Sequence, residues 1–369
     1  MKNITIRELR GNDMEQMLVL LKSRDDLGEG GAEKRQVLME WLAFKNPYEN
    51  DEATYFIADD QGKIVAHLGR MPMEFVIKGN LRRGYYFHDL YVHPEYRKKG
   101  LGLFLSMSLY NAAEKNSKSF CFCIWTNEIN LNFQRKRGYH ELKYPSYVKI
   151  LDPYPILIKR IKGQKQVAKI ASLILKQVLW ILDFFIFSLS KYRSKEIKVF
   201  EINRFDENFD CLQKRLLDKI GISPFKSSNY LNWKYVDRPF PKTTIFMARK
   251  NNEICGAIVL AMKEREGLFY EGTIVDILAD PSDKEILWGL FRTAIDYFRK
   301  KKVCSIKCCS ADSKQTKILK KFLFFGPVLN MPLTIANVKK LEEEERGYFQ
   351  HIDNWHINYG DSDGLMLVP

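Results

Sequence analysis

The sequence predicts an α/β fold with a mixed sheet, built as two similar halves that are joined by a long helical linker. Strand-like and helix-like patterns alternate through the first 150 residues. The later part of the chain repeats short segments of the first in the same order, and a long apolar stretch separates the two. At 369 residues the chain also exceeds what one hydrophobic core usually supports.

The elements of the first half are expected in the order β-α-α-β-β-β-loop-α-β-α-β. Apolar or alternating runs predict strands at residues 4–7, 53–58, 63–71, 85–92 and 120–125. Apolar residues at helical spacing predict helices at residues 13–22, 33–44, 101–114 and 130–136.

The second half repeats this plan in weaker form. Trp41 is followed by Pro47, and Trp233 by Pro239, at the same spacing. Residues 89–94 are likewise echoed by residues 276–281. Because such matches keep a common order, we predict a tandem duplication. The predicted parts are a first domain at residues 1–150, a linker at 151–196 and a second, degenerate domain at 197–369.

The linker contains one long helix candidate at residues 162–191. The lysines that share one face of it are Lys162, Lys165, Lys169 and Lys176. A membrane span would bury Lys169, Lys176 and Asp183 at a cost of about 2.5–3.5 kcal/mol each. We therefore expect the helix to pack between the domains, or to rest as a basic amphipathic helix on an anionic membrane surface.

Composition and charge restrict the function classes. The net charge of +14 attracts polyanions, but no helix-turn-helix, Cys/His finger or dense basic arm appears, so no nucleic-acid partner is expected. The seven cysteines form no paired CxxC modules, which argues against a disulfide framework and against a structural metal. The first residues lack an apolar signal segment, and a cytoplasmic location is expected.

The loop at residues 97–102 reads Arg-Lys-Lys-Gly-Leu-Gly and lies between a predicted strand and a predicted helix. A helix start leaves N–H groups unpaired and carries positive potential, which makes it an anion site. Gly100 and Gly102 allow the chain to turn sharply and present those groups to a diphosphate. The loop is neither a Walker A motif nor a dinucleotide fingerprint.

Residues 87–96, which lead into this loop, resemble the signature strand and loop of the GCN5-related N-acetyltransferase family, and residues 125–139 resemble its following segment. The resemblance covers the first 150 residues, and the remainder only through the duplication. It implies two acyl-CoA N-acyltransferase-like domains, the first of which uses acetyl-CoA as a co-substrate and needs no metal.

The resemblance also implies the cofactor contacts. Backbone amides of the loop would hold the pyrophosphate, and the pantetheine arm would lie between the strands at 89–93 and 120–125. The thioester carbonyl would accept a hydrogen bond from the backbone at Tyr91 or Val92. The cofactor-binding residues expected on this basis are Tyr91, Val92, Arg97, Lys98, Lys99, Gly100, Leu101, Gly102, Leu103 and Asn127.

Direct attack of an amine or hydroxyl on the thioester calls for a general base. Asp89 is the first candidate, followed by His88 and then His93. Gln134 stands where the family often has a general-acid tyrosine. Because the leaving thiol has a pKa of about 8.5, we expect its absence to slow the reaction by about 10²-fold without abolishing it.

The second half lacks the glycine loop and has Asp283 and Glu285 at the corresponding place, where they would repel a diphosphate. We predict that this half binds no coenzyme A and shapes the acceptor pocket or supports the fold. The residues considered as lining for such a pocket are Trp233, Tyr235, Trp355 and His356.

The predicted function is a bacterial acetyltransferase that acts on an amine or hydroxyl of a small polar acceptor, with an amino sugar of cell-surface polysaccharide synthesis as the candidate. Two alternatives stay open. One is an aminoacyl-tRNA-dependent peptidoglycan-bridge transferase, which would need no coenzyme A loop. The other is a non-catalytic acetyl-CoA-binding regulatory or membrane-surface protein, suggested by Gln134 and the helix at residues 162–191.

Overall fold

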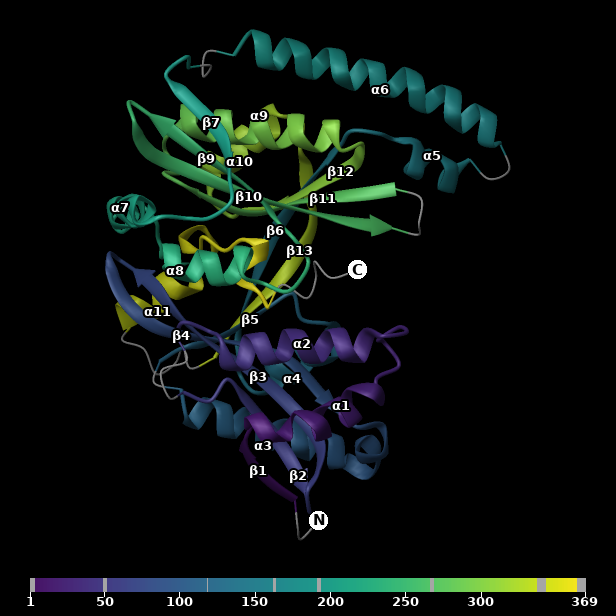
Figure 1. Cartoon of the computed structure of the whole chain (residues 1–369), viewed down its shortest axis with the longest axis vertical. Helices are drawn as coiled ribbons and strands as arrows, with labels where there is room; N and C mark the ends of the chain where they lie inside the picture. The colour runs from purple at the N-terminus through teal and green to yellow at the C-terminus, as the bar shows by residue number, and fades with distance from the viewer. Residues whose placement is uncertain are drawn as a thin grey trace.

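The computed structural model describes residues 4–48, 52–117, 119–161, 164–190, 194–265, 269–336 and 343–363. Within these residues the strands join into one 13-stranded sheet that contains both parallel and antiparallel pairs. Helices pack on both faces of this sheet (Figure 1). The predicted α/β fold with a mixed sheet is confirmed.

The first half has the predicted order of elements. They are β1 (Ile4–Glu8), η1 (Gly11–Asp13), α1 (Met14–Lys22), α2 (Gly31–Phe44), β2 (Tyr55–Asp60), β3 (Lys63–Ile77), β4 (Asn80–Val92), η2 (Pro94–Gly100), α3 (Leu101–Lys115), β5 (Cys121–Ile124), α4 (Glu128–Lys136) and β6 (His140–Ile150). The loop before α3 is itself a 3-10 turn, η2, which the sequence pattern did not predict.

Two helices occupy the linker. The short α5 (Tyr154–Arg160) precedes α6 (Lys165–Ser188), which makes up most of the predicted long helix. Lys162 lies outside the described residues. In Figure 1, α6 crosses the end of the molecule that is farthest from α3, β1 and β2.

The second half repeats the element order of the first. It contains β7 (Ile197–Ile202), α7 (Glu207–Leu216), β8 (Ser223–Pro224), α8 (Ser228–Leu231), η3 (Asn232–Val236), β9 (Thr244–Lys250), β10 (Glu253–Arg265), β11 (Phe269–Ala279), α9 (Lys284–Lys300), β12 (Val303–Cys309), α10 (Ser313–Lys321), β13 (Phe325–Ala336), α11 (Glu343–Gln350), η5 (Ile352–Asn354) and η6 (Tyr359–Asp361). Both halves contain a strand, two helices and three strands, followed by a helix, a strand, a helix and a last strand. A duplication would produce such a recurrence. The duplication and its boundaries stay a prediction.

The two halves exchange their last strands. The sheet order runs β1-β2-β3-β4-β5-β13-β6-β12-β11-β10-β9-β7. Strand β13 therefore pairs with β5 of the first half, with Leu333 opposite Ile124, and β6 pairs with β12 of the second half, with Tyr147 opposite Cys308. Because each half contributes a strand to the other, cutting the chain in the linker would leave neither half with its full set of strands.

The segment after α11 is buried in the first half. Trp355, Ile357 and Tyr359 belong to the same core cluster as Trp41 of α2, on the face of the sheet covered by α1 and α2. Helix α3 covers the opposite face through residues such as Leu105. The C-terminal segment thus lies beside the ends of β4 and β5, where the candidate site is found.

Candidate functional site

The turn between β4 and α3 has the geometry of an anion site. Gly100 adopts a left-handed conformation with φ of +75°, which favours glycine. A Cβ atom at Gly102 would lie 3.0 Å from the Cα atom of Arg97, so a side chain there would displace the turn. No acidic residue lies in the first turn of α3. The N–H of Leu101 donates to the carbonyl oxygen of Lys98, and the next N–H groups of the helix start are the ones placed to meet an anion.

Arg97 and Tyr96 attach this turn to the sheet. The guanidinium Nε of Arg97 donates to the carbonyl oxygen of Val92 at 2.7 Å and lies over the ring of Tyr91, 4.9 Å from its centre. The hydroxyl of Tyr96 donates to Asp60 at 2.7 Å. Arg97 and Lys98 are both exposed, and Arg97 also attaches the turn to β4.

Strands β4 and β5 separate just before this turn. They pair in parallel at Tyr85–Cys121 and Tyr86–Phe122 only. The N–H of His93 donates to Val65 on β3, so His93 faces β3 and its neighbour Val92 faces the open edge. Of the two backbone donors predicted for the thioester, Val92 therefore points into the gap between β4 and β5, and Tyr91 is paired with His67 on β3.

Asn127 begins α4. Its side-chain oxygen accepts a hydrogen bond from the N–H of Asn130 at 2.9 Å, and the residue is exposed. It lies three residues beyond the end of β5. The structure gives it a helix-capping role.

The side chain of Asp89 is buried between two arginines, and the residue adopts a φ of 51°. Its carboxylate lies 2.8 Å from Arg24 and 2.5 Å from Arg35, and only 2% of its side chain is exposed. Burial alone would raise the pKa of Asp89, but the positive charge of Arg35 and its neighbours holds it well below the usual range. Such a carboxylate is a weak proton acceptor, and the geometry favours a role in fixing α1 and α2 on β4.

His88 lies on the same face of β4 as Asp89. It contacts the carboxylate of Asp363, which was not among the catalytic residues predicted from the sequence. Its Nδ1 lies 3.4 Å from Oδ2 of Asp363 in the C-terminal segment, and its ring stacks on Tyr86 at 5.4 Å. Burial would raise the pKa of Asp363, but the interaction with His88 lowers it. A Cβ at Gly69 would come within 2.5 Å of the His88 ring, so this glycine makes room for the imidazole.

Two cations from the second half hold the end of the C-terminal segment. Lys234 donates to the carbonyl oxygen of Ser362 at 2.5 Å, and Arg238 donates to that of Asp363 at 3.3 Å. Burial lowers the pKa of Lys234 to about 7. A lysine among aromatic residues in the segment 232–236 is the only sequence signal that could have indicated this contact.

Gln134 joins three elements of the first half to strand β13 of the second half. Its amide donates to the hydroxyl of Tyr110 at 3.1 Å and to Sγ of Cys123 at 3.0 Å, and it accepts from Thr334 on β13 at 2.8 Å. The side chain is buried. Gln134 therefore stabilises the junction of α4, α3, β5 and β13 and does not face a leaving group as an acid.

His93 caps the turn η2, since its Nδ1 accepts from the N–H of Glu95 at 3.3 Å. In the second half Asp283 occupies the equivalent helix start. Its carboxylate accepts from the N–H groups of Glu285 and Ile286, both at 3.1 Å, so that helix start already holds an anion. The absence of coenzyme A from this half stays a prediction.

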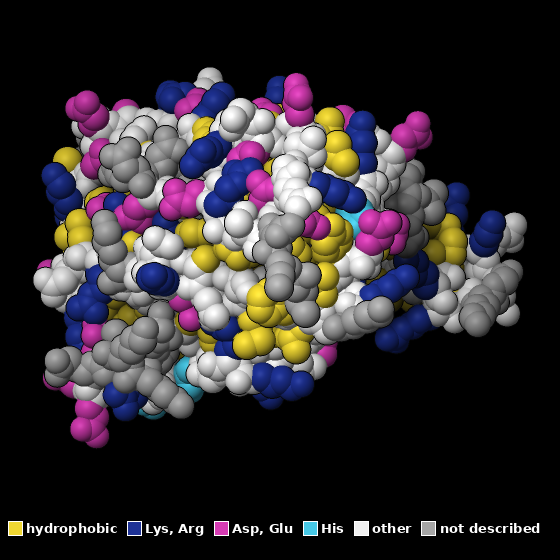
Figure 2. All heavy atoms as spheres, turned by 90° about the horizontal axis from the view of Figure 1, so that it is seen from below, with side chains coloured by type: hydrophobic (Ala, Val, Ile, Leu, Met, Phe, Trp, Pro, Cys, Tyr) yellow, Lys and Arg dark blue, Asp and Glu magenta, His cyan; other side chains and the backbone are white. Residues whose placement is uncertain are grey.

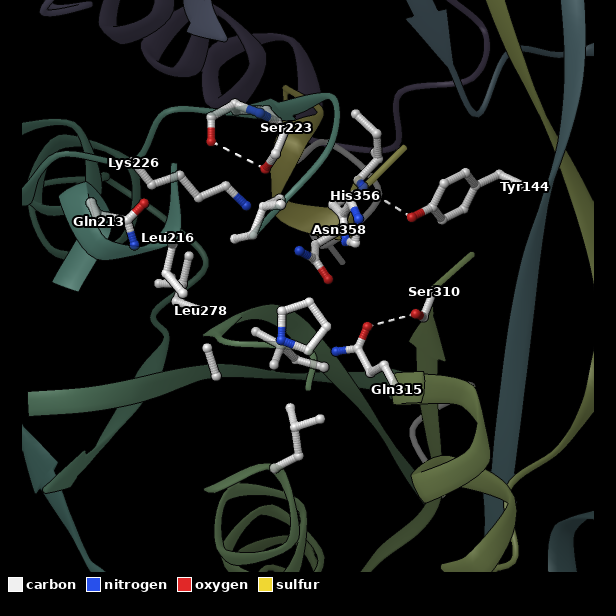
Figure 3. Close-up of a pocket in the computed structure, with 17 residues that line it drawn as sticks. Tyr144, Gln213, Leu216, Ser223, Lys226, Leu278, Ser310, Gln315, His356 and Asn358 are labelled. Carbon is white, nitrogen blue, oxygen red and sulfur yellow. Dashed lines mark hydrogen bonds between the residues drawn. The ribbon is translucent and has the colours of Figure 1, made fainter. Parts of the chain in front are cut away.

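Strands β11 and β12 also separate, and a pocket opens there between the second half and the C-terminal segment (Figure 3). The labelled polar residues at its wall are Tyr144, Gln213, Ser223, Lys226, Ser310, Gln315, His356 and Asn358. Of the four predicted lining residues, His356 lines this pocket. The other three do not line it. Trp233 and Trp355 lie in the core cluster that contains Trp41, and the hydroxyl of Tyr235 donates to Asp276 at 2.7 Å. Among the described residues, no group of three His, Cys, Asp or Glu side chains is arranged to hold a metal ion.

Comparison with known proteins agrees with this geometry. Residues 19–139 match the sequence model of the Acetyltransferase (GNAT) family. No curated protein matches the sequence. A GCN5-related N-acetyltransferase from Anabaena variabilis is similar in structure, with a TM-score of 0.58 and 11% identity over 90% of this chain and 72% of that one. A GCN5-related N-acetyltransferase from Kribbella flavida has a TM-score of 0.58 and 10% identity over 90% and 70% of the two chains.

A third similar structure is the Saccharomyces cerevisiae N-myristoyltransferase with bound myristoyl-CoA. Its TM-score is 0.55 at 11% identity, over 91% of this chain and 83% of that one. At such identities the likeness concerns the fold. Because it extends over nine tenths of the chain, it includes the second half.

Proposed function

The chain carries an acyltransferase domain of the GNAT family at residues 19–139, and from this premise we propose that it transfers an acetyl group from acetyl-CoA to an amine or hydroxyl of a small polar acceptor. The observation that supports this proposal most directly is the glycine turn before α3. Gly100 is left-handed and Gly102 has no room for a side chain. Both features bring main-chain donors to the surface.

In the proposed complex the pyrophosphate lies on the first turn of α3, at the backbone of Lys99, Gly102 and Leu103, with Lys98 at the rim. The pantetheine arm lies in the gap between β4 and β5, and Asn127 contacts it at the far edge. The N–H of Val92 stabilises the oxyanion that forms as the thioester is attacked. These contacts are supported by the separation of β4 from β5 after Tyr86.

We propose His88 as the group that takes the acceptor's proton, through a water molecule, with Asp363 as a positioning residue. The acceptor nitrogen or oxygen forms a bond to the acyl carbon, the carbon–sulfur bond breaks, the proton passes to His88 and coenzyme A leaves as a thiolate. Asp89 is the less suitable base, because two arginines hold its negative charge.

We propose an amino sugar of cell-surface polysaccharide synthesis as the first acceptor class to test, and the cytoplasm as the place of action. Free thiols at all seven cysteines agree with a reducing compartment. A tRNA-dependent reaction is less favoured. On the face of the molecule in Figure 2, Lys and Arg side chains are interspersed with acidic ones and form no continuous basic surface.

The experiment is an acetyl-transfer assay with labelled acetyl-CoA and a panel of amino sugars, nucleotide-linked amino sugars, amino alcohols and peptides. Mass spectrometry should find one acceptor class that gains a single acetyl group, and turnover should fall about 10²-fold or more in His88→Gln. Binding of acetyl-CoA with no turnover on any acceptor would instead support a non-catalytic acetyl-CoA sensor.

A further inference from the structure

Helix α6 turns its apolar side chains to the surface, whereas an ordinary surface helix turns them to the core. Its buried side chains are mostly small or polar: Ala168, Ser172, Asp183 and Phe187. Its exposed side chains are large and apolar: Val167, Ile170, Leu173, Ile174, Leu175, Val178, Trp180, Ile181, Leu182, Phe184 and Phe185. A surface helix normally turns its apolar stripe to the core. An exposed apolar face of this extent marks an interaction surface.

A buried ion cluster fixes this orientation. Asp183 accepts a hydrogen bond from Nζ of Lys149 at 2.9 Å and pairs with Arg299 of α9. Lys149 also donates to the carbonyl oxygen of Phe322 at 2.7 Å, and Phe187 packs against the ring of Phe322 at 5.5 Å. Rotating α6 to hide its apolar face would carry Asp183 away and leave the buried Lys149 ammonium without its counter-charge, at a large cost in free energy.

Basic side chains accompany the apolar face. A groove of about 360 Å³ runs beside α6 and is lined by Lys176, Arg299 and Lys302, together with apolar residues that include Trp180. Lys176 is paired with Asp152 at 2.8 Å and Arg299 with Asp183, whereas Lys302 is exposed at the rim. Lys165 and Lys169 are exposed near the start of the helix. Apolar bulk flanked by positive charge is complementary to a bilayer that exposes anionic headgroups.

We propose that α6 lies in the plane of an anionic phospholipid bilayer, with its outward apolar side chains among the acyl chains and the exposed Lys165, Lys169 and Lys302 on the headgroup phosphates. The helix is also long and apolar enough to cross a membrane. In-plane binding keeps the Asp183 cluster intact, whereas spanning would pull it from α9. Because α3 lies at the opposite end of the molecule (Figure 1), the glycine turn would face the aqueous side.

The test uses the full chain and vesicle sedimentation, with vesicles of phosphatidylcholine alone or mixed with phosphatidylglycerol. Binding should be stronger with the anionic lipid. Ile174→Glu and Phe184→Glu, at exposed positions of α6, should each weaken binding about tenfold. Leu81→Glu, at an equally exposed apolar position far from α6, is the matched control and should bind like the wild type.

Substitutions of the exposed lysines separate the charge effect from the apolar one. Lys169→Gln and Lys302→Gln should each reduce binding to the anionic vesicles about fivefold and leave binding to neutral vesicles nearly unchanged. Circular dichroism checks that every variant is folded.

Three results would overturn the proposal. One is a lack of binding to either kind of vesicle. A second is a dimer in sedimentation velocity that Phe184→Glu dissociates, with no vesicle binding, which would assign the face to a second copy of the chain. The third is retention of the protein in membranes after alkaline carbonate extraction, which would show that α6 spans the bilayer.

Discussion

Replacing Asp89 by asparagine removes the anion that Arg24 and Arg35 share beneath α1 and α2. The side chains of the two arginines are only 12% and 11% exposed. Arg24 would keep its pair with Asp26 at 2.8 Å, but the Arg35 guanidinium would stay buried without its directly paired carboxylate. Removing one partner of a buried ion pair typically costs about 3–5 kcal/mol. We therefore expect Asp89→Asn to lower the free energy of unfolding by about that amount and to raise the acceptor KM, because α1 and α2 lose their attachment to β4.

The assay is urea unfolding at pH 7, followed by steady-state kinetics on the folded fraction. Asp237→Asn is the control, since it removes one side of an exposed pair with Arg204 and should leave the unfolding midpoint nearly unchanged. The pKa of Asp89 is lower in the folded protein than in the unfolded chain, so its stabilisation is present at neutral pH and is lost as the pH falls below about 4. An unchanged unfolding midpoint with a kcat reduced 10²-fold or more would refute this reasoning and restore Asp89 as the base.

Three further predictions concern the same region. Asp363→Asn should lower kcat by about tenfold or more with little change in acceptor KM, and the double variant with His88→Gln should be no slower than His88→Gln alone; additive losses would contradict the pairing. Gln134→Leu should cost about 1–3 kcal/mol in urea unfolding, because Tyr110 and Thr334 lose a buried partner; an unchanged midpoint would argue against this bridging role. Lys234 has a folded pKa near 7, below its unfolded value, so unfolding binds a proton and stability should rise between pH 7 and about 10. Lys234→Met should flatten that rise, and a wild type without the rise would contradict a buried Lys234.

The sequence predicted the elements of the first half because each is encoded by local periodicity. Met17 and Leu21 repeat at helical spacing, and β2 and β3 are joined by a short polar turn. The position of the glycine turn was predicted correctly. A backbone with positive φ, as at Gly100, favours glycine, and the glycine is visible in the sequence. Only its 3-10 form was missed.

The exchange of β6 and β13 was not predicted, because it depends on pairing between residues almost 200 positions apart. Leu142 pairs with Leu333, and nothing in either local pattern distinguishes this pairing from a hairpin. The same distance hid the contact of His88 with Asp363 and that of Lys234 with Ser362. Such contacts are set by topology and leave no signal in a single sequence.

The outward-facing apolar side of α6 was predicted only in part. The sequence indicated a long apolar helix with basic residues, but a helix that is apolar on most of its surface does not reveal which stripe it buries. The position of Asp183 against Lys149 decides that question in the folded chain.

The central claim is that the first turn of α3 holds the diphosphate of an acyl-CoA, and calorimetric titration of acetyl-CoA tests it most directly. Gly102→Val should weaken binding by about 10²-fold, the equivalent of losing one or two charge-assisted hydrogen bonds, since its side chain would displace the Arg97 backbone. Gly347→Val, at a glycine of α11 with open space around it, is the matched control. Unchanged acetyl-CoA affinity in folded Gly102→Val would contradict the account.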